Sequence, residues 1–139
     1  MGGALKFLLD TNVILEVALG QEKAAEAGRL LQSGREGLFI SDLSLYSVGI
    51  HLYRRRKPEI YSQLMNDVFI PGAVQITSLP IEAHTLISSA VQSHGLDFED
   101  AYQYCVATHL ALSLISFDAD FDRTPLKRLT PDNAMASPQ

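Results

Sequence analysis

The stretch from Phe7 to Leu15 constrains the fold of this chain more than any other part of the sequence. Its apolar run Phe7-Leu8-Leu9 stops at Asp10, and apolar residues resume at Val13. The run is too short and too apolar to alternate, so it predicts a strand covered on both faces, as in a parallel sheet. Asp10 then follows the carboxyl end of a strand, where ligands bind in open α/β sheets. It either caps the helix that comes next or forms part of a site.

Short apolar runs and helical patterns alternate along the rest of the chain. Further strands are predicted at 38–40, 74–76, 114–117 and, as a final edge strand, 127–129; helices are predicted at 13–19, 22–32, 43–57, 59–69, 80–94 and 97–112. This alternation predicts an α/β fold, a three-layer α/β/α sandwich with a mostly parallel central sheet. We expect one domain over residues 1–139, with its core at about 6–133 and a loose C-terminal tail at 134–139.

The composition narrows the class of protein. A net charge of -5 does not favour a large nonspecific nucleic-acid surface, but it suits a site built from carboxylates. Cys105 is the one cysteine, so no disulfide forms within the chain and a reducing cytoplasm is the expected location. No run approaches the roughly 20 apolar residues of a spanning helix, so we expect a soluble protein with no membrane contact.

Acidic residues end two of the predicted strands and begin one predicted helix. Asp10 and Asp118 follow strands that should end at the same edge of a parallel sheet, and Asp97 and Asp100 share a helix face three residues apart. Asp97 and Asp100 have an ordinary interpretation, because an N-cap and acids in the first turn suit the helix dipole. The same geometry would deliver Asp100 toward Asp10 and Asp118.

Three carboxylates at one place need a compensating charge, because they cannot all stay ionised alone. Mg²⁺ or Mn²⁺ prefers oxygen ligands and keeps several waters. Such an ion can lower the pKa of a water that attacks a phosphodiester. The acidic residues therefore predict a divalent metal site for Asp10, Asp100 and Asp118, with catalysis at phosphate esters.

Three segments together resemble the PIN domain, and in particular the small prokaryotic PIN proteins of the VapC toxin type. They are Leu8–Leu15, Asp97–Tyr104 and Leu114–Phe121, and the resemblance covers about residues 6–133. It implies a metal-dependent ribonuclease for single-stranded RNA, a homodimer, and an antitoxin partner that blocks it. In this resemblance the first, third and fourth acids of the family fall on Asp10, Asp100 and Asp118. The family's Asn falls on Asn12, and Ser116 stands where the family often has Thr.

The sequence departs from that family pattern at its second acid. The family usually carries a Glu about six residues beyond a Ser in the helix after the second strand, and counting from Ser41 reaches Ser47. A serine hydroxyl is a poor substitute for a carboxylate on Mg²⁺. Glu99 is the candidate for an additional metal ligand.

The cluster Arg54-Arg55-Arg56-Lys57 ends a predicted helix just before Pro58. One interpretation is a solvated helix end, since cations there are favoured by the helix dipole. The other is contact with a nucleic-acid backbone, which makes Arg54 and Arg55 candidate substrate-binding residues alongside Asn12 and Ser116.

Three hypotheses for function follow from these patterns. The first is a metal-dependent ribonuclease, the toxin of a toxin–antitoxin pair. The second is a catalytically weak PIN-like module that acts by binding protein or RNA, and Ser47 motivates it. The third is a phosphatase of the haloacid-dehalogenase type with Asp10 as nucleophile, although Asn12 stands where that chemistry needs an acid.

Overall fold

Four parallel strands form the central sheet of the computed structural model, which describes residues 5–137. They are β1 (Phe7–Leu9), β2 (Leu38–Ser41), β3 (Gln75–Thr77) and β4 (Ser113–Ile115), and they lie in the order β3-β2-β1-β4. Every pairing in this sheet is parallel, with Leu8 opposite both Phe39 and Leu114. The predicted parallel sheet is confirmed.

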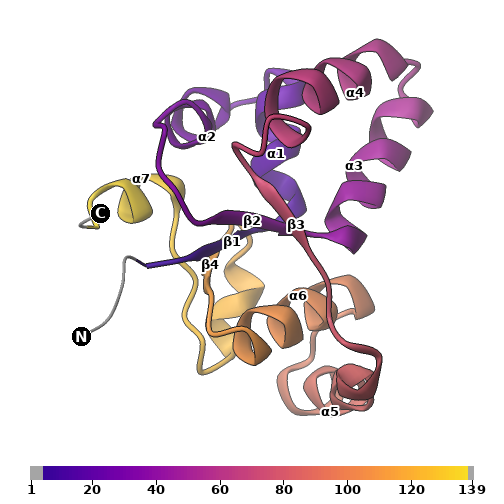
Figure 1. The fold of residues 1–139 in the computed structure, drawn as a ribbon. Coiled ribbons are helices and arrows are strands. Elements are labelled where there is room, and N and C mark those ends of the chain that lie inside the picture. The colour runs from indigo at the N-terminus through magenta and orange to yellow at the C-terminus, as the bar shows by residue number, and fades with distance from the viewer. Residues whose placement is uncertain (1–4, 138–139) are drawn as a thin grey trace.

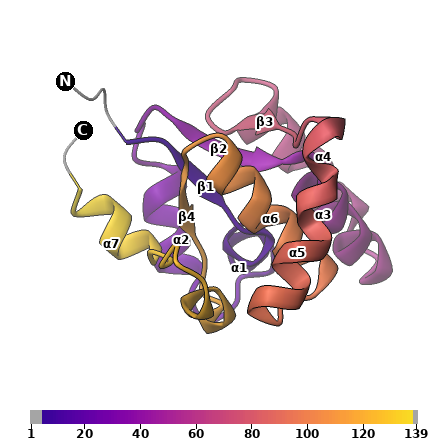
Figure 2. The ribbon, with the colours of Figure 1, turned by 90° about the horizontal axis from the view of Figure 1, so that it is seen from below.

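Helices cover both faces of this sheet (Figure 1). They are α1 (Thr11–Leu19), α2 (Ala24–Leu31), α3 (Asp42–Arg54), α4 (Pro58–Leu64), α5 (Thr85–His94), α6 (Phe98–His109) and α7 (Pro131–Met135), with short π or 3₁₀ turns η1 (Met65–Phe69), η2 (Ile81–His84) and η3 (Ala119–Arg123). Helices α1 to α4 lie on one face; Figure 2 shows α5 and α6 on the other. The predicted three-layer α/β/α sandwich is confirmed.

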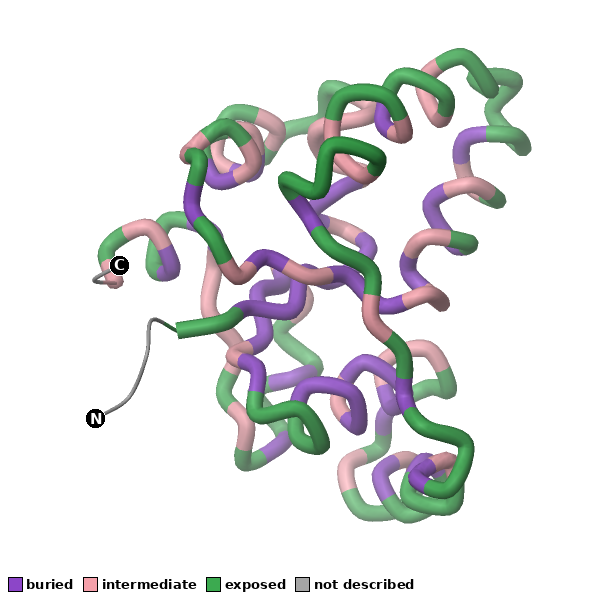
Figure 3. Tube along the Cα trace, in the orientation of Figure 1, coloured by how far each residue is buried: buried purple, intermediate pink, exposed green. Residues whose placement is uncertain are grey.

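The sheet separates two apolar clusters, and the strand residues alternate between them. Phe7 and Leu9 pack with Val13 of α1 and its neighbours on one face, whereas Leu8 packs with Val106 of α6 on the other. All three β1 residues are fully buried, and the tube in Figure 3 has the colour of buried residues along this strand. This double burial explains why the strand sequence is apolar throughout.

Two predictions near the C-terminus were wrong. Residues 127–129 do not form a strand; only Leu129 makes an isolated bridge to Ile115, and Lys127 has φ +48, which an extended chain cannot adopt. The predicted tail begins with the end of helix α7, whose Thr130 and Asn133 form a capping box and whose Ala134 is fully buried. Residues 138–139 of that tail lie outside the described part.

Two other predicted helices differ from the structure because one turn of each has π or 3₁₀ geometry in place of α geometry. The predicted helix at 59–69 begins at Pro58 and changes to π geometry at Met65. The helix predicted from Pro80 starts as the 3₁₀ turn η2 and ends, as predicted, at Gly95 with φ +65. None of the helices in the described residues has both the length and the apolar composition needed to cross a membrane.

Candidate functional site

The register of β1 and β4 brings Asp10 and Ser116 together. Leu9 pairs with Ile115, so the next residue of each strand emerges at the same edge of the sheet. The Ser116 hydroxyl donates to Asp10 Oδ2 at 2.7 Å, and the Asp118 N–H donates to Ser116 Oγ at 2.9 Å. The Ser116 side chain therefore links Asp10, which follows β1, to the backbone of Asp118, which comes after β4.

Asp10 is buried and accepts hydrogen bonds at both carboxylate oxygens. Its Oδ1 accepts the Thr11 N–H at 2.8 Å, which caps α1, and lies 3.5 Å from Gln103 Nε2. Its Oδ2 accepts the Ser116 hydroxyl and, at 3.3 Å, Asn12 Nδ2. Two short and two long contacts thus surround a carboxylate with about four acceptor positions. Asp10 therefore caps α1, as one interpretation of the sequence expected, and its other oxygen contacts residues that lead to Asp118.

Asn12 and Ser116 connect Asp10 to the loop that follows β4. Asn12 Nδ2 also lies 3.2 Å from Ser116 Oγ, and Asn12 Oδ1 accepts the Phe117 N–H at 3.3 Å. Ser116 is completely buried. Both side chains therefore contact Asp10 and position the backbone that carries Asp118.

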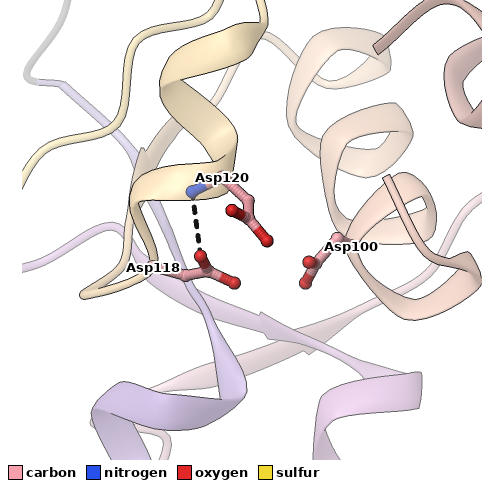
Figure 4. Close-up of side chains that lie close together, drawn as sticks. All are labelled: Asp100, Asp118 and Asp120. Carbon is pink, nitrogen blue, oxygen red and sulfur yellow. Dashed lines mark hydrogen bonds between the residues drawn. The ribbon is translucent and has the colours of Figure 1, made fainter. Parts of the chain in front are cut away.

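Asp100, Asp118 and Asp120 form a three-carboxylate cluster (Figure 4). One carboxylate oxygen from each lies within 4.8 Å of the others. Asp100 comes from the first turn of α6, where Asp97 caps the helix by accepting the Asp100 N–H at 2.8 Å. Asp118 caps η3 by accepting the Asp120 N–H at 2.8 Å, which turns Asp120 back toward Asp100. Asp120 was not among the predicted site residues; its Asp-x-Asp spacing with Asp118 was the available signal.

The buried and clustered carboxylates at this edge of the sheet favour the binding of protons or of a cation. Burial raises the pKa of Asp100 to about 7, with further increases from the negative charges of Asp10, Asp97, Asp118 and Glu99. Burial also raises the pKa of Asp10 to about 6, against the lowering effect of its hydrogen bonds from Ser116 and Thr11. A divalent cation would compete with these protons, because both neutralise the same carboxylates.

Glu99 and Ser47 are not members of the three-carboxylate cluster. Glu99 Oε1 accepts the Thr11 hydroxyl at 3.0 Å, and Thr11 Oγ1 lies 2.9 Å from Ser44 Oγ. Ser47 is a buried residue of α3, three residues beyond Ser44. The position expected for a second acid therefore carries a neutral hydroxyl, and Asp120 supplies the third carboxylate of the cluster.

Arg54 and Arg55 are exposed at the far end of α3. The first turn of α3 reaches the site through Ser44, and ten residues of helix place Arg54 about 15 Å further along the axis. Arg55 Nη1 contacts the carbonyl and ring of His51 at 3.2 Å. The structure thus separates these two arginines from the carboxylates.

Gln103 is a residue of the site that sequence analysis missed. It is completely buried in α6, three residues after Asp100, and its Nε2 contacts both Ser44 Oγ and Asp10. The available signal was a glutamine among the apolar residues of the buried helix face. Which neighbours it meets depends on how α6 packs against α1 and α3.

Comparison with solved structures finds proteins that share this fold. A toxin–antitoxin complex from Klebsiella pneumoniae has 20% sequence identity and a TM-score of 0.71, covering 91% of this chain and 98% of that one. Mycobacterium tuberculosis VapC20, a sarcin–ricin loop cleaving toxin, has 17% identity and a TM-score of 0.77, covering 91% and 100%. Rickettsia felis VapBC2 bound to a promoter DNA fragment has 15% identity and a TM-score of 0.68, covering 90% and 97%. A sequence comparison with curated proteins gave no match. The family model of the PIN domain matches residues 7–127, and the chain therefore belongs to the PIN domain family.

Proposed function

We propose that this protein is a divalent-metal-dependent ribonuclease that cleaves single-stranded RNA and acts as the toxin of a toxin–antitoxin pair. The observation that carries the proposal is the gathering of Asp100, Asp118 and Asp120 beside Asp10 at the carboxyl edge of a PIN-family sheet. The structural neighbour VapC20 is a sarcin–ricin loop cleaving toxin, which supports RNA as the substrate class.

The donor set fits a hard divalent cation. Asp100, Asp118 and Asp120 offer only carboxylate oxygens, all within 4.8 Å of one another, and such ligands suit Mg²⁺ or Mn²⁺. We propose that these three residues hold the ion and that Asp10 contributes its charge from the buried side. Activation of water and neutralisation of charge at the phosphate are what such an ion supplies when bound.

The other polar residues of the site hold the acids in place. Ser116 donates to Asp10 and accepts from the Asp118 N–H, so it fixes the two strand-end acids relative to each other. Asn12 braces the same loop through the Phe117 N–H. The three-carboxylate cluster lies at the surface, since Asp120 is exposed, and an RNA phosphate can approach it there.

We also propose an antitoxin partner for this chain. Two of the structural neighbours are a toxin–antitoxin complex and a VapBC pair. An apolar groove of about 390 Å³ lies among α1, α2, α4 and η1, and it suits the apolar face of a partner helix. Its apolar lining includes Val17, Ala18, Leu31, Ile60, Leu64 and Val68.

A homodimer is the third part of the proposal. Tyr46, Ile50 and Tyr53 are exposed and, at spacings of four and three, share one face of α3. An exposed apolar stripe of this kind is typical of an interaction surface. We expect sedimentation to show a dimer for the unaltered chain and a monomer for Ile50→Glu; a monomer in both would contradict this part.

The proposed activity is tested by incubating the full chain with a pool of single-stranded RNAs and Mn²⁺. We expect cleavage by the unaltered protein and by Asp67→Asn, a control at an exposed residue of η1, and none by Asp100→Asn. If all three proteins leave the pool intact, the ribonuclease proposal fails.

The second candidate function is a catalytically weak PIN module that acts by binding. The buried Ser47, where the family usually has an acid, is the observation that favours it. Mn²⁺ binding tighter than millimolar, together with RNA cleavage, would exclude it. Retained binding of RNA or protein without cleavage would support it.

A further inference from the structure

Gln103 has one buried polar atom with no partner. Its side chain is completely buried in α6, and Oε1 makes no hydrogen bond to any atom of residues 5–137. Nε2 of the same amide contacts Ser44 Oγ and lies 3.5 Å from Asp10 Oδ1. One half of the amide is thus used at the site while the other half is buried without compensation.

Packing alone does not account for a glutamine here. A buried carbonyl without a partner lowers stability, whereas a methionine of similar length would fill the same space without that cost. Most other buried residues of α6 are small or apolar, and the one other polar group among them, the Tyr102 hydroxyl, is hydrogen-bonded to Asp42 and to the Leu79 N–H. What a methionine could not do is donate to Asp10 and Ser44.

The Gln103 amide joins three helices behind Asp10. Ser44 of α3 lies 2.9 Å from the Thr11 hydroxyl of α1, which in turn donates to Glu99 of α6 at 3.0 Å. Gln103 links this chain of hydroxyl groups to Asp10 Oδ1. The contact falls on the carboxylate oxygen opposite to the one that Ser116 holds.

We propose that Gln103 is a positioning residue, whose amide fixes the plane of the Asp10 carboxylate relative to the cluster of Asp100, Asp118 and Asp120. Thr11 N–H and Gln103 hold Oδ1, so Oδ2 stays beside Ser116 and the backbone of Asp118. Buried donors to the carboxylates of a metal site tune its affinity in this manner. The inference rests on the proposed metal-dependent function.

The test is calorimetric titration of Mn²⁺ into the full chain, with thermal unfolding of the same samples without metal. We expect Gln103→Met to bind Mn²⁺ about 10-fold more weakly than the unaltered protein, the lower end of the effect known for partners of metal ligands, because Asp10 lies beside the three proposed ligands. We expect its Tm to change little, because removal of the unpartnered carbonyl offsets the loss of the amide's contacts with Ser44 and Asp10. Gln92→Met, at an exposed position of α5, is the matched control and should bind Mn²⁺ normally.

A purely structural role gives the opposite pair of results: a lower Tm for Gln103→Met and unchanged Mn²⁺ affinity. That result overturns the inference while leaving the proposed function intact. If Gln103→Met does not fold, the same titration is made with Ser44→Ala. This variant removes the contact between the Gln103 amide and the Ser44 hydroxyl, and it keeps the helix cap made by the Ser41 side chain. Weaker Mn²⁺ binding in Ser44→Ala supports the inference, and unchanged binding overturns it.

Saturable binding that Asp118→Asn abolishes shows that the metal site itself exists; no binding by the unaltered protein overturns both proposals.

Discussion

Replacing Asp100 with Asn should stabilise the metal-free protein at alkaline pH. Its pKa rises from the ordinary value of 3.8 to about 7 because the carboxyl is partly buried among other acids. A fully buried group with this change would cost about 4 kcal/mol of folding free energy when ionised. Asp100 is partly exposed, and solvent screens its charge, so we expect a gain of about 2 kcal/mol in Asp100→Asn. For a domain of this size that corresponds to an increase in Tm of roughly 5–10 °C.

The gain depends on pH in a defined direction. The folded protein keeps the Asp100 proton up to about pH 7, whereas the unfolded chain releases it near the ordinary pKa of 3.8. Between these values the folded state binds more protons, so the stability of the unaltered protein falls as the pH rises. The advantage of Asp100→Asn is therefore complete above about pH 7 and absent below about pH 4. The raised pKa of Asp10 leaves a smaller dependence in both proteins.

Thermal unfolding with a chelator at pH 4.5, 6 and 8 measures this effect. The difference in Tm between Asp100→Asn and the unaltered protein should grow steadily across the series. Asp67→Asn, on the exposed surface of η1, should show no such growth. A Tm for Asp100→Asn at pH 8 that equals or falls below that of the unaltered protein would refute the electrostatic reasoning.

Three further predictions concern metal, the buried serine and the last helix. Saturating Mn²⁺ should flatten the fall in stability between pH 4 and 8, since the ion replaces the protons on Asp100; an unchanged slope in thermal scans would count against a site there. Ser116→Ala should lower the free energy of unfolding by about 1–3 kcal/mol in urea, because Asp10 and the Asp118 N–H both lose a buried partner, whereas Ser113→Ala in the same strand should change it by less than about 0.5 kcal/mol. Thr130→Ala should cost about 1 kcal/mol by removing the α7 capping box, and an unchanged urea midpoint would contradict this.

The sheet edge of the site could be predicted from the sequence. Asp10 and Asp118 follow two apolar strands, and in a parallel sheet such strands end at the same edge. Asp100 could be predicted because Asp97 marks the helix start. These inferences needed only short-range patterns and one rule of sheet topology.

The remaining parts of the site depend on tertiary contacts that no local pattern contains. Asp120 enters the cluster because Asp118 caps η3 and reverses the chain, which the sequence Asp-Ala-Asp alone does not require. Gln103 meets Asp10 and Ser44 only once α6 has packed across α1 and α3. Glu99 pairs with Thr11, a residue 88 positions earlier in the chain.

Helix α7 was missed for a different reason. The segment from Pro131 to Met135 has few apolar residues and reads as a polar tail, although Thr130, Pro131 and Asn133 carry a helix-start signal. Its docking on α2 includes an ion pair of 3.1 Å between Arg29 and Asp132, which sequence patterns do not reveal.

The most direct test of the proposed metal site is a calorimetric titration of Mn²⁺ into the full chain and into Asp118→Asn, with Asp67→Asn as the charge-matched control. We predict saturable binding by the unaltered protein and by Asp67→Asn, and loss of that binding in Asp118→Asn. Equal binding by all three proteins, or no binding by the unaltered chain, would contradict a metal site at Asp100, Asp118 and Asp120.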